Sequence, residues 1–206
     1  NPLQGVTLTF SHDSGTTSTA ADGSYSYSID YGTTTTVTPS HEGYHGWTPA
    51  NRTLNNVSGD QSGQNFQGVI NTYTISGTVT DGSNPVAGAT LTFSHDSGTA
   101  TTAANGTYSY SVDYGTTTTI TPSHGGYHSW TPADRTVSNI SANVSGRNFQ
   151  GVPNSYTISG TVTDGTNPIS GATLTFSHDS GTTTTAADGT YSYTVDYGTT
   201  TTVTPS

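Results

Sequence analysis

One stretch of eight residues, Leu-Thr-Phe-Ser-His-Asp-Ser-Gly, occurs three times in this chain at a constant interval. Its copies are Leu8–Gly15, Leu91–Gly98 and Leu174–Gly181, and they follow one another every 83 residues. The flanking sequence repeats with them, so the chain holds about two and a half copies of one unit. A near-identical tandem repeat restricts the fold to one that a unit of this size forms by itself.

The complete copy, Tyr73–Gly151, shows the alternation of apolar and polar residues that is typical of half-buried strands. Ala89, Leu91 and Phe93 alternate with threonines, as Tyr108 does with serines. No stretch has a helical period over about ten residues. About seven short strands separated by turn residues predict an all-β fold, a row of tandem antiparallel β-sandwich domains, Ig-like or transthyretin-like, in a rod.

The turns and junctions refine this prediction. Ala104-Asn105-Gly106 predicts a hairpin, because Asn-Gly accepts a positive φ at both central positions. The junctions Gln67–Thr72 and Gln150–Ser155 predict linkers of about five residues, short enough to make the row of domains semi-rigid.

The register of the repeat predicts three domains. Residues 1–70 form a β-sandwich repeat that lacks its first strand, 71–153 a complete repeat, and 154–206 a repeat that lacks its last strands. Incomplete sandwiches expose sheet edges, and head-to-tail completion between two chains duplicates the middle of the unit. We therefore expect this sequence to be a window on a longer array, with Asn1-Pro2 as a mature or internal start.

The amino-acid composition limits the classes of partner and the cellular compartment that we expect. Apolar residues make up 28% and charged residues 8%, but abundant Thr, Val, Ile and Tyr favour strands over disorder. The net charge is −10, and Arg52, Arg135 and Arg147 are the only basic side chains apart from histidine, so nucleic acid is not expected as a partner. Cys is absent, which excludes disulfides and thiolate metal sites.

We expect an extracellular or cell-surface protein. The sequence combines the absence of Lys and Cys with many Thr, Ser, Gly and Asn residues, and it contains no apolar run of the roughly 18 residues that a membrane span needs. No membrane span is therefore predicted in this sequence.

Three segments carry a family resemblance. SGTVTDGSNPVAGATLTF at 76–93, TTAANGTYSYSVDYGTTTTITPS at 101–123 and the tail GYHSWTPADRTVSNISANVSGRNFQG at 126–151 resemble the carboxypeptidase regulatory-like domains of bacterial surface and secreted proteins. The resemblance covers essentially all of Tyr73–Gly151. It implies a transthyretin-like sandwich that serves as a spacer, stalk or accessory module, and it implies no catalytic residues.

The sequence departs from related tandem families in its lack of lysine. The Gly-Tyr pairs of such tails often follow Lys, whereas here they follow His41-Glu42 and His124-Gly125. The neighbouring stalk domains of adhesins and pilins are cross-linked by Lys–Asn isopeptide bonds, which this sequence excludes.

His95-Asp96-Ser97 and its two copies contain the residue types of a hydrolase triad. A triad brings nucleophile, base and orienting carboxylate together from separate elements, which three consecutive residues on one turn do not do. We interpret the stretch as a polar turn whose Asp or Ser bonds local backbone, and we expect no catalytic residue and no cofactor.

Histidine pairs and scattered carboxylates are the candidates for metal binding. His41 and His45, like His124 and His128, stand four apart, but glycines interrupt any helix there. No Asp-rich calcium loop occurs. We therefore predict no metal site, while a weak site with His95 and Asp96 and calcium between units are the alternatives.

The aromatic residues of the tail are candidates for stacking on sugar rings. They are Trp47, Trp130, Tyr44 and Tyr127. The alternative is packing in the core and corners of the sandwich, where large aromatics also occur.

Two further features predict attached sugars. The Asn-x-Ser/Thr pattern occurs at Asn51, Asn56, Asn105, Asn139 and Asn143, of which Asn56 and Asn139 share one position in the repeat. Runs of threonine also offer hydroxyls for O-linked sugars.

Together these observations predict a structural extracellular protein, a bacterial stalk, fibril or adhesin shaft, with glycosylation as an added feature. The alternatives are a carbohydrate-binding or adhesive module and an accessory region of a secreted hydrolase. The expected partners are copies of the chain itself in a longer array or fibril, and glycans that are attached or bound.

Overall fold

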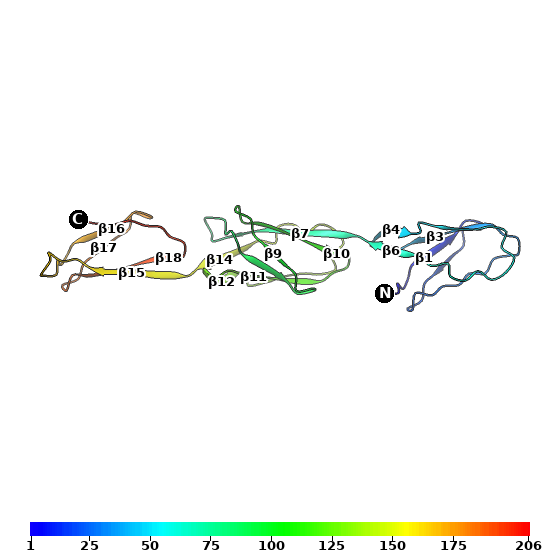
Figure 1. Ribbon diagram of the computed structural model, residues 1–206, viewed down its shortest axis with the longest axis horizontal. Helices are drawn as coiled ribbons and strands as arrows, with labels where there is room; N and C mark the ends of the chain where they lie inside the picture. The colour runs from blue at the N-terminus through cyan, green and yellow to red at the C-terminus, as the bar shows by residue number, and fades with distance from the viewer. The chain divides into compact units, whose positions relative to one another are not determined.

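The computed structural model describes residues 1–206 and contains strands and loops but no helix (Figure 1). The predicted all-β, sandwich-type fold class is confirmed. No helix is present that could cross a bilayer. The chain forms two compact units, one made of Asn1–Ile75, Ser111–Thr117 and Val137–Val144, the other of Ser76–Tyr110, Thr118–Thr136 and Ser145–Ser206. The predicted division into three domains stays a prediction.

Residues 1–70, the first repeat, form two sheets. The strand order of the larger sheet is β2-β1-β3-β5, and the smaller sheet pairs β4 with β6. Leu8, Phe10 and Val37 alternate with threonines and are buried, so one face of the larger sheet carries the core and the other carries hydroxyls. The strands are β1 (Thr7–Phe10), β2 (Thr16–Ser18), β3 (Thr35–Ser40), β4 (Tyr44–Thr48), β5 (Arg52–Leu54) and β6 (Gln67–Ile70).

The middle repeat, residues 71–153, contains two four-stranded sheets. Their strand orders are β10-β7-β14-β12 and β13-β11-β8-β9. Ala89, Leu91 and Phe93 are fully buried, as their alternation with threonine predicts. The strands are β7 (Thr72–Thr80), β8 (Thr90–Phe93), β9 (Thr99–Thr101), β10 (Thr107–Asp113), β11 (Thr118–Ser123), β12 (Tyr127–Thr131), β13 (Arg135–Val137) and β14 (Phe149–Pro153).

Residues 154–206, the last repeat, form a two-stranded sheet of β15 with β18 and a three-stranded sheet of order β17-β16-β19. Leu174 and Phe176 are buried at the positions of Leu91 and Phe93. The strands are β15 (Ser155–Thr161), β16 (Thr173–Phe176), β17 (Thr182–Thr184), β18 (Thr190–Asp196) and β19 (Val203–Pro205).

One strand pair is parallel, whereas the alternation of the sequence predicted antiparallel pairing. Phe149 and Gln150 of β14 pair with Val79 and Thr80 of β7 in the same direction. Parallel strands need a long connection between them. Most of the middle repeat lies between β7 and β14 and supplies that connection.

The turn predicted at Ala104-Asn105-Gly106 is present, because the Gly106 N–H donates to the Ala103 carbonyl at 2.8 Å and the Ala103 N–H to the Thr107 carbonyl at 2.9 Å, but the hairpin does not extend into two paired strands. β9 belongs to the sheet of β8, and β10 belongs to the sheet of β7, so this turn leads from one sheet to the other. Gly106 has a φ of 74°, whereas Asn105 is not in the left-handed region. The turn therefore needs only one residue with positive φ, which Gly supplies.

The predicted linkers of about five residues are wrong, because most of each junction is strand. β6 ends at Ile70 and β7 begins at Thr72, which leaves Asn71 alone between them. β14 ends at Pro153 and β15 begins at Ser155, which leaves Asn154.

Candidate functional site

The His-Asp-Ser turn of the middle repeat is part of a hydrogen-bond network that joins three segments, the turn itself, β10 and β11. Nδ1 of His95 lies 3.1 Å from the hydroxyl oxygen of Thr118, and its Nε2 lies 3.3 Å from Oδ2 of Asp96. The Tyr110 hydroxyl donates to the same Oδ2 at 2.6 Å, and the Gly98 N–H donates to Oδ1 at 2.8 Å. Both carboxylate oxygens of Asp96 are therefore engaged.

The same network occurs in all three repeats. Phe93 stacks on Tyr110 at a centroid distance of 4.0 Å and so fixes the ring that reaches Asp96. The corresponding residues are His12, Asp13, Gly15, Tyr27 and Thr35 in the first repeat and His178, Asp179, Gly181, Tyr193 and Thr201 in the last.

These contacts shift the pKa values of Asp96 and Tyr110 in opposite directions. The Tyr110 hydroxyl, then the Gly98 N–H, and more weakly the neighbouring His95, lower the pKa of Asp96, while partial desolvation opposes them. The same hydrogen bond raises the pKa of Tyr110. The network thus combines a carboxylate with a neutral phenol at neutral pH.

The network does not have the arrangement of a catalytic triad. His95 contacts Thr118 and Asp96, and Ser97 is not among its partners. Thr118 is only 1% exposed, so its hydroxyl is closed to a substrate. The Asp carboxylate bonds the Gly98 N–H two residues ahead, as the interpretation as a polar turn predicts.

The four tail aromatics pair within their own repeats and are half-buried. Tyr44 stacks on Trp47 at 5.7 Å, and Tyr127 stacks on Trp130 at 5.4 Å. Trp47 also packs against the core of the first repeat. Packing accounts for one face of each ring, and stacking of sugars on the remaining surface stays a prediction.

Three of the four histidines of the tail contact nearby residues. The ring of His41 lies edge-on to Tyr44 at 5.3 Å, and Nδ1 of His45 lies 3.0 Å from Oδ1 of Asn71. His124 is edge-on to Tyr127 at 5.2 Å, and His128 is exposed. No group of three or more His, Cys, Asp or Glu side chains is placed to hold a metal ion.

All five candidate glycosylation sites, Asn51, Asn56, Asn105, Asn139 and Asn143, are exposed. Two of their side chains already bond backbone. Oδ1 of Asn143 accepts from the Thr74 N–H at 2.9 Å, and Oδ1 of Asn105 accepts from the N–H and hydroxyl of Thr107. Asn56 and Asn139 have positive φ. Attachment of sugars at these residues stays a prediction.

Each junction residue is held by backbone hydrogen bonds on both sides. The Asn71 N–H donates to the Gly43 carbonyl at 2.7 Å, and the Asn71 carbonyl accepts from the Tyr114 N–H at 2.8 Å. The Tyr114 ring covers Gly43, and a hydrogen bond with Glu42 raises the pKa of Tyr114.

The second junction repeats the pattern. The Asn154 N–H donates to the Gly126 carbonyl at 2.8 Å, and the Asn154 carbonyl accepts from the Tyr197 N–H at 2.7 Å. The Tyr197 ring covers Gly126 and lies edge-on to Tyr127 at 6.2 Å. Tyr31, at the same position of the first repeat, is 86% exposed.

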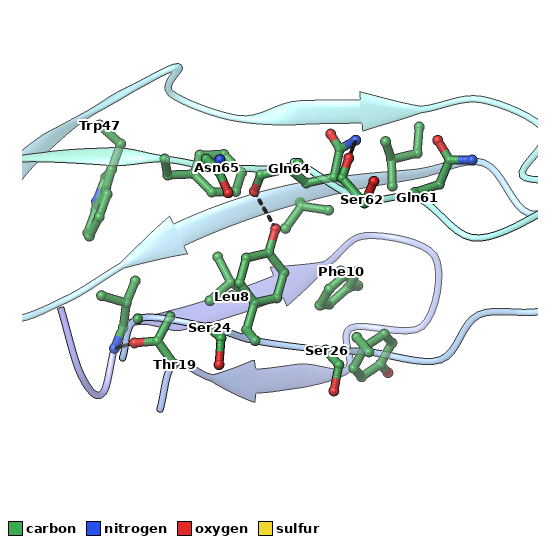
Figure 2. A pocket seen from close by; sticks show the side chains of 18 of the residues that line it. Leu8, Phe10, Thr19, Ser24, Ser26, Trp47, Gln61, Ser62, Gln64 and Asn65 are labelled. Carbon is green, nitrogen blue, oxygen red and sulfur yellow. Dashed lines mark hydrogen bonds between the residues drawn. The ribbon is translucent and has the colours of Figure 1, made fainter. Parts of the chain in front are cut away.

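The first repeat also contains a groove of about 1270 Å³. Figure 2 shows Leu8 and Phe10 of β1 on one side and Gln61, Gln64 and Asn65 on the other. The Tyr25 hydroxyl donates to the Gln64 carbonyl at 2.6 Å, the dashed line that ends at Gln64 in Figure 2.

The groove leaves apolar side chains uncovered that are buried in the middle repeat. Tyr108 and Phe149 are 4% and 2% exposed, whereas their counterparts Tyr25 and Phe66 are half-exposed. Ser24–Asp30 forms no strand, although the same positions of the middle repeat are β10.

Sequence reasoning missed both the tyrosine network and the junction contacts. The signal for the network was the constant spacing between each Asp of the His-Asp-Ser turn and the second tyrosine of Tyr-Ser-Tyr, which places Tyr110 after Asp96 in every copy. The signal for the junctions was the Asp-Tyr-Gly turn after β10, whose tyrosine no core position explains.

Part of the chain is similar in sequence to a known bacterial protein. No protein-family model matches the chain. A stretch of 133 residues, 63% of this chain, is 39% identical to chitinase ChiA of Flavobacterium johnsoniae. The matched part spans only 8% of the length of ChiA.

Solved structures are similar in fold. The Bacillus anthracis TIE protein superposes on 100% of this chain and 42% of its own, with a TM-score of 0.67 and 13% sequence identity. This likeness supports the all-β fold. GBS52, the minor pilin of Streptococcus agalactiae, covers 75% of this chain and 86% of its own with 12% identity, but its TM-score of 0.32 is too low to carry an argument.

Proposed function

We propose that this chain is a non-catalytic, extracellular structural module, a segment of a bacterial stalk, fibril or adhesin shaft whose length is set by the number of repeats. The observation that carries the proposal is the pair of junctions. At each, a single residue outside the strands, Asn71 or Asn154, bonds through both its N–H and its carbonyl. Such a junction leaves little backbone freedom, as a load-transmitting array requires.

The tyrosines that cover the junction glycines provide the test. Tyr114→Ala and Tyr197→Ala each remove a ring from Gly43 or Gly126 and should increase motion between repeats. Tyr31→Ala is the matched control, because Tyr31 holds the same repeat position and is exposed. Small-angle scattering should show a broader distance distribution for Tyr114→Ala and for Tyr197→Ala than for the unchanged chain. The distribution of Tyr31→Ala should equal that of the unchanged chain. Equal profiles for all four proteins would overturn the proposal.

The finer identity is also a proposal. The carboxypeptidase regulatory-like resemblance of residues 73–151 and the all-β fold support membership of that family of spacer domains. Exposed sequons at Asn56 and Asn139 support a glycoprotein. Mass spectrometry of peptides from the native protein tests for attached sugars. Peptide masses equal to those of the bare polypeptide would overturn the proposal of glycosylation and leave the proposed structural role unaffected.

A second candidate is an accessory region of a secreted polysaccharide hydrolase. The 39% identity to a stretch of chitinase ChiA favours it. A chitin pull-down and a glycan array distinguish an accessory region of a hydrolase from a structural spacer, because a spacer binds neither chitin nor the glycans of the array. If the chain binds, Trp130→Ala should weaken binding, since Trp130 is one of the half-exposed stacked aromatics.

A further inference from the structure

Strand β18 of the last repeat is paired along one edge only. It pairs antiparallel with β15 over its whole length, from Thr190 opposite Thr161 to Asp196 opposite Ser155, without a register shift. No strand lies beside its other edge. The counterpart of β18 in the complete middle repeat is β10, which is likewise the outermost strand of its sheet. A free edge at this position therefore belongs to the complete repeat.

Alternate residues of β18 bond to β15. The ladder is flanked by a bond from the Val162 N–H to the Gly189 carbonyl at 2.9 Å and by one from the Tyr197 N–H to the Asn154 carbonyl at 2.7 Å. Bonded pairs alternate with non-bonded pairs in an antiparallel ladder. The residues of β18 that bond to β15 are therefore Tyr191, Tyr193 and Val195.

The residues between them offer their backbone groups to the free edge. These are Ser192 and Thr194, whose N–H and carbonyl groups point away from β15 and form no other backbone hydrogen bond. Both side chains are exposed. Unpaired backbone donors and acceptors on an edge strand are a template for an additional strand.

The other edge strands of the middle repeat are short or irregular. β9 and β13 have three residues each, and the register of β12 shifts between Tyr127 and Ser129. Short strands, bulges, Pro and Lys are the devices by which edge strands avoid pairing. β10 and β18 have seven residues each and contain neither Pro nor Lys. They are therefore the edges at which a further strand can pair.

Open space lies beside this edge in the middle repeat. A groove of about 550 Å³ runs between β9 and the first residues of β10. It is lined by Thr99, Ala100, Thr101, Ala103, Thr107, Tyr108 and Ser109. This end of the edge is therefore accessible to another strand.

The sequence of β18 is complementary to itself in antiparallel pairing. When Tyr193 lies opposite Tyr193 of a second copy, Ser192 lies opposite Thr194, and their outward backbone groups exchange hydrogen bonds in two symmetry-related pairs. Tyr191 then lies opposite Val195. Aromatic pairs, aromatic pairs with β-branched residues and pairs of hydroxyl side chains all stabilise neighbouring strands.

The charges of the strand permit this register. Asp196 is the only charged residue of β18, and it lies opposite Thr190 of the second copy rather than opposite another carboxylate. β10 has the same pattern, with Asp113 opposite Thr107 when Tyr110 is at the centre. Like charges directly opposite would destabilise the pair, and none occur here.

We propose that the free edge of β18, and that of β10, pairs antiparallel with the same edge of a second copy of this chain, so that two copies join through a continuous sheet. This inference goes beyond the proposed structural role, which concerns repeats along one chain. The junction variants that test that role leave this edge unchanged, so the two proposals fail separately.

The first test uses the unchanged chain. The mass measured by sedimentation should rise with protein concentration, and more so at high salt, because salt screens the repulsion between chains of net charge −10. Hydrogen exchange at the amides of Ser192 and Thr194 should slow as the concentration rises. The amides of Tyr191 and Tyr193, which bond to β15, should be protected at every concentration.

The second test places lysines at the outward-pointing positions. In the paired state they set like charges directly opposite each other, and association should weaken at least about tenfold. The lysines also reduce the net negative charge, so greater overall repulsion does not explain a loss. The substitutions are Ser109→Lys, Ser111→Lys, Ser192→Lys and Thr194→Lys.

The matched control carries four lysines on the neighbouring strands β7 and β15, at exposed residues of the same sheets. These substitutions are Thr72→Lys, Thr74→Lys, Ser155→Lys and Thr157→Lys. The control should associate at least as strongly as the unchanged chain.

Three results would overturn the proposal. The first is a constant mass up to millimolar concentration at high salt. The second is association of the edge variant that equals that of the control. The third is association without slower exchange at Ser192 and Thr194, a measurement that needs no variant and that would assign the contact to another surface.

Discussion

The Tyr110 hydroxyl donates a 2.6 Å hydrogen bond to Oδ2 of Asp96, and the same contact recurs at the same length between Tyr27 and Asp13 and between Tyr193 and Asp179. Tyr110 lies in β10 and Tyr193 in β18, whereas Asp96 and Asp179 lie in the turns that follow β8 and β16 of the other sheet. In the middle and last repeats the bond therefore ties the two sheets together, and in the first repeat it holds Tyr27 of the Ser24–Asp30 segment to the turn after β1.

The bond predicts a loss of stability in acid. Because the pKa of Asp96 lies below its ordinary value of 3.8 in the folded chain, ionisation of this carboxyl favours the folded state above pH 3.8. That contribution should disappear as the pH falls from 3.8 through the lowered folded pKa. Melting temperatures measured between pH 7 and pH 2 should fall in this range, and less steeply for Asp96→Asn.

Asp134→Asn is the control for this prediction, because Asp134 is exposed and makes no side-chain hydrogen bond. Its acid profile should follow that of the unchanged chain. A profile of Asp96→Asn that is as steep as that of the unchanged chain would contradict the stabilising role of the pair.

The buried Tyr108 predicts a loss of stability in alkali. Desolvation raises the pKa of Tyr108 to about 12, against the attraction of Arg135 and Arg147. A group with a raised folded pKa contributes stability that is present below its ordinary pKa of 10 and is lost as the pH rises through about 12. Denaturation between pH 9 and pH 12 should therefore require progressively less urea.

Tyr108→Phe should reduce this alkaline dependence, of which the other tyrosines with a raised pKa keep a part, and should lower stability by about 1 kcal/mol at neutral pH, because the Arg147 carbonyl loses its donor. Tyr25→Phe should have a smaller effect, since Tyr25 is half-exposed. Equal effects of the two variants would show that burial does not control the strength of this bond.

The close approach of backbone to Gly77 predicts that no side chain is tolerated at this position. Gly77→Ala places a methyl group against the Arg147 carbonyl and should destabilise the middle repeat by about 1–3 kcal/mol. Gly125→Ala is the control, because an added Cβ there meets nothing within 4 Å. Hydrogen exchange of the β10 amides measures the stability of the middle repeat in both variants. Equal stability of Gly77→Ala and Gly125→Ala would contradict the close approach of the Arg147 carbonyl to Gly77.

The strands and the core were predictable from sequence because they depend on local alternation. Leu91 and Phe93 alternate with threonine and are buried, and Ile75 and Val79 are buried on one face of β7. The repeat sharpened these predictions, since each strand could be read in two or three copies.

The pairing between distant segments could not be predicted in this way. The parallel pairing of Phe149 with Val79 depends on how the sheets close, which alternation does not encode. The turn at Asn105-Gly106 has hairpin chemistry but connects two sheets, because the preceding β9 pairs with β8 instead. The junction bonds of Asn71 also join segments far apart in sequence.

We propose that the chain is part of a structural array of 83-residue repeats. Electron micrographs of the native protein test this proposal. We predict beads in a line at a constant spacing of one repeat, with the spacing kept when the number of repeats changes. An isolated globule without regular beads would contradict the proposal.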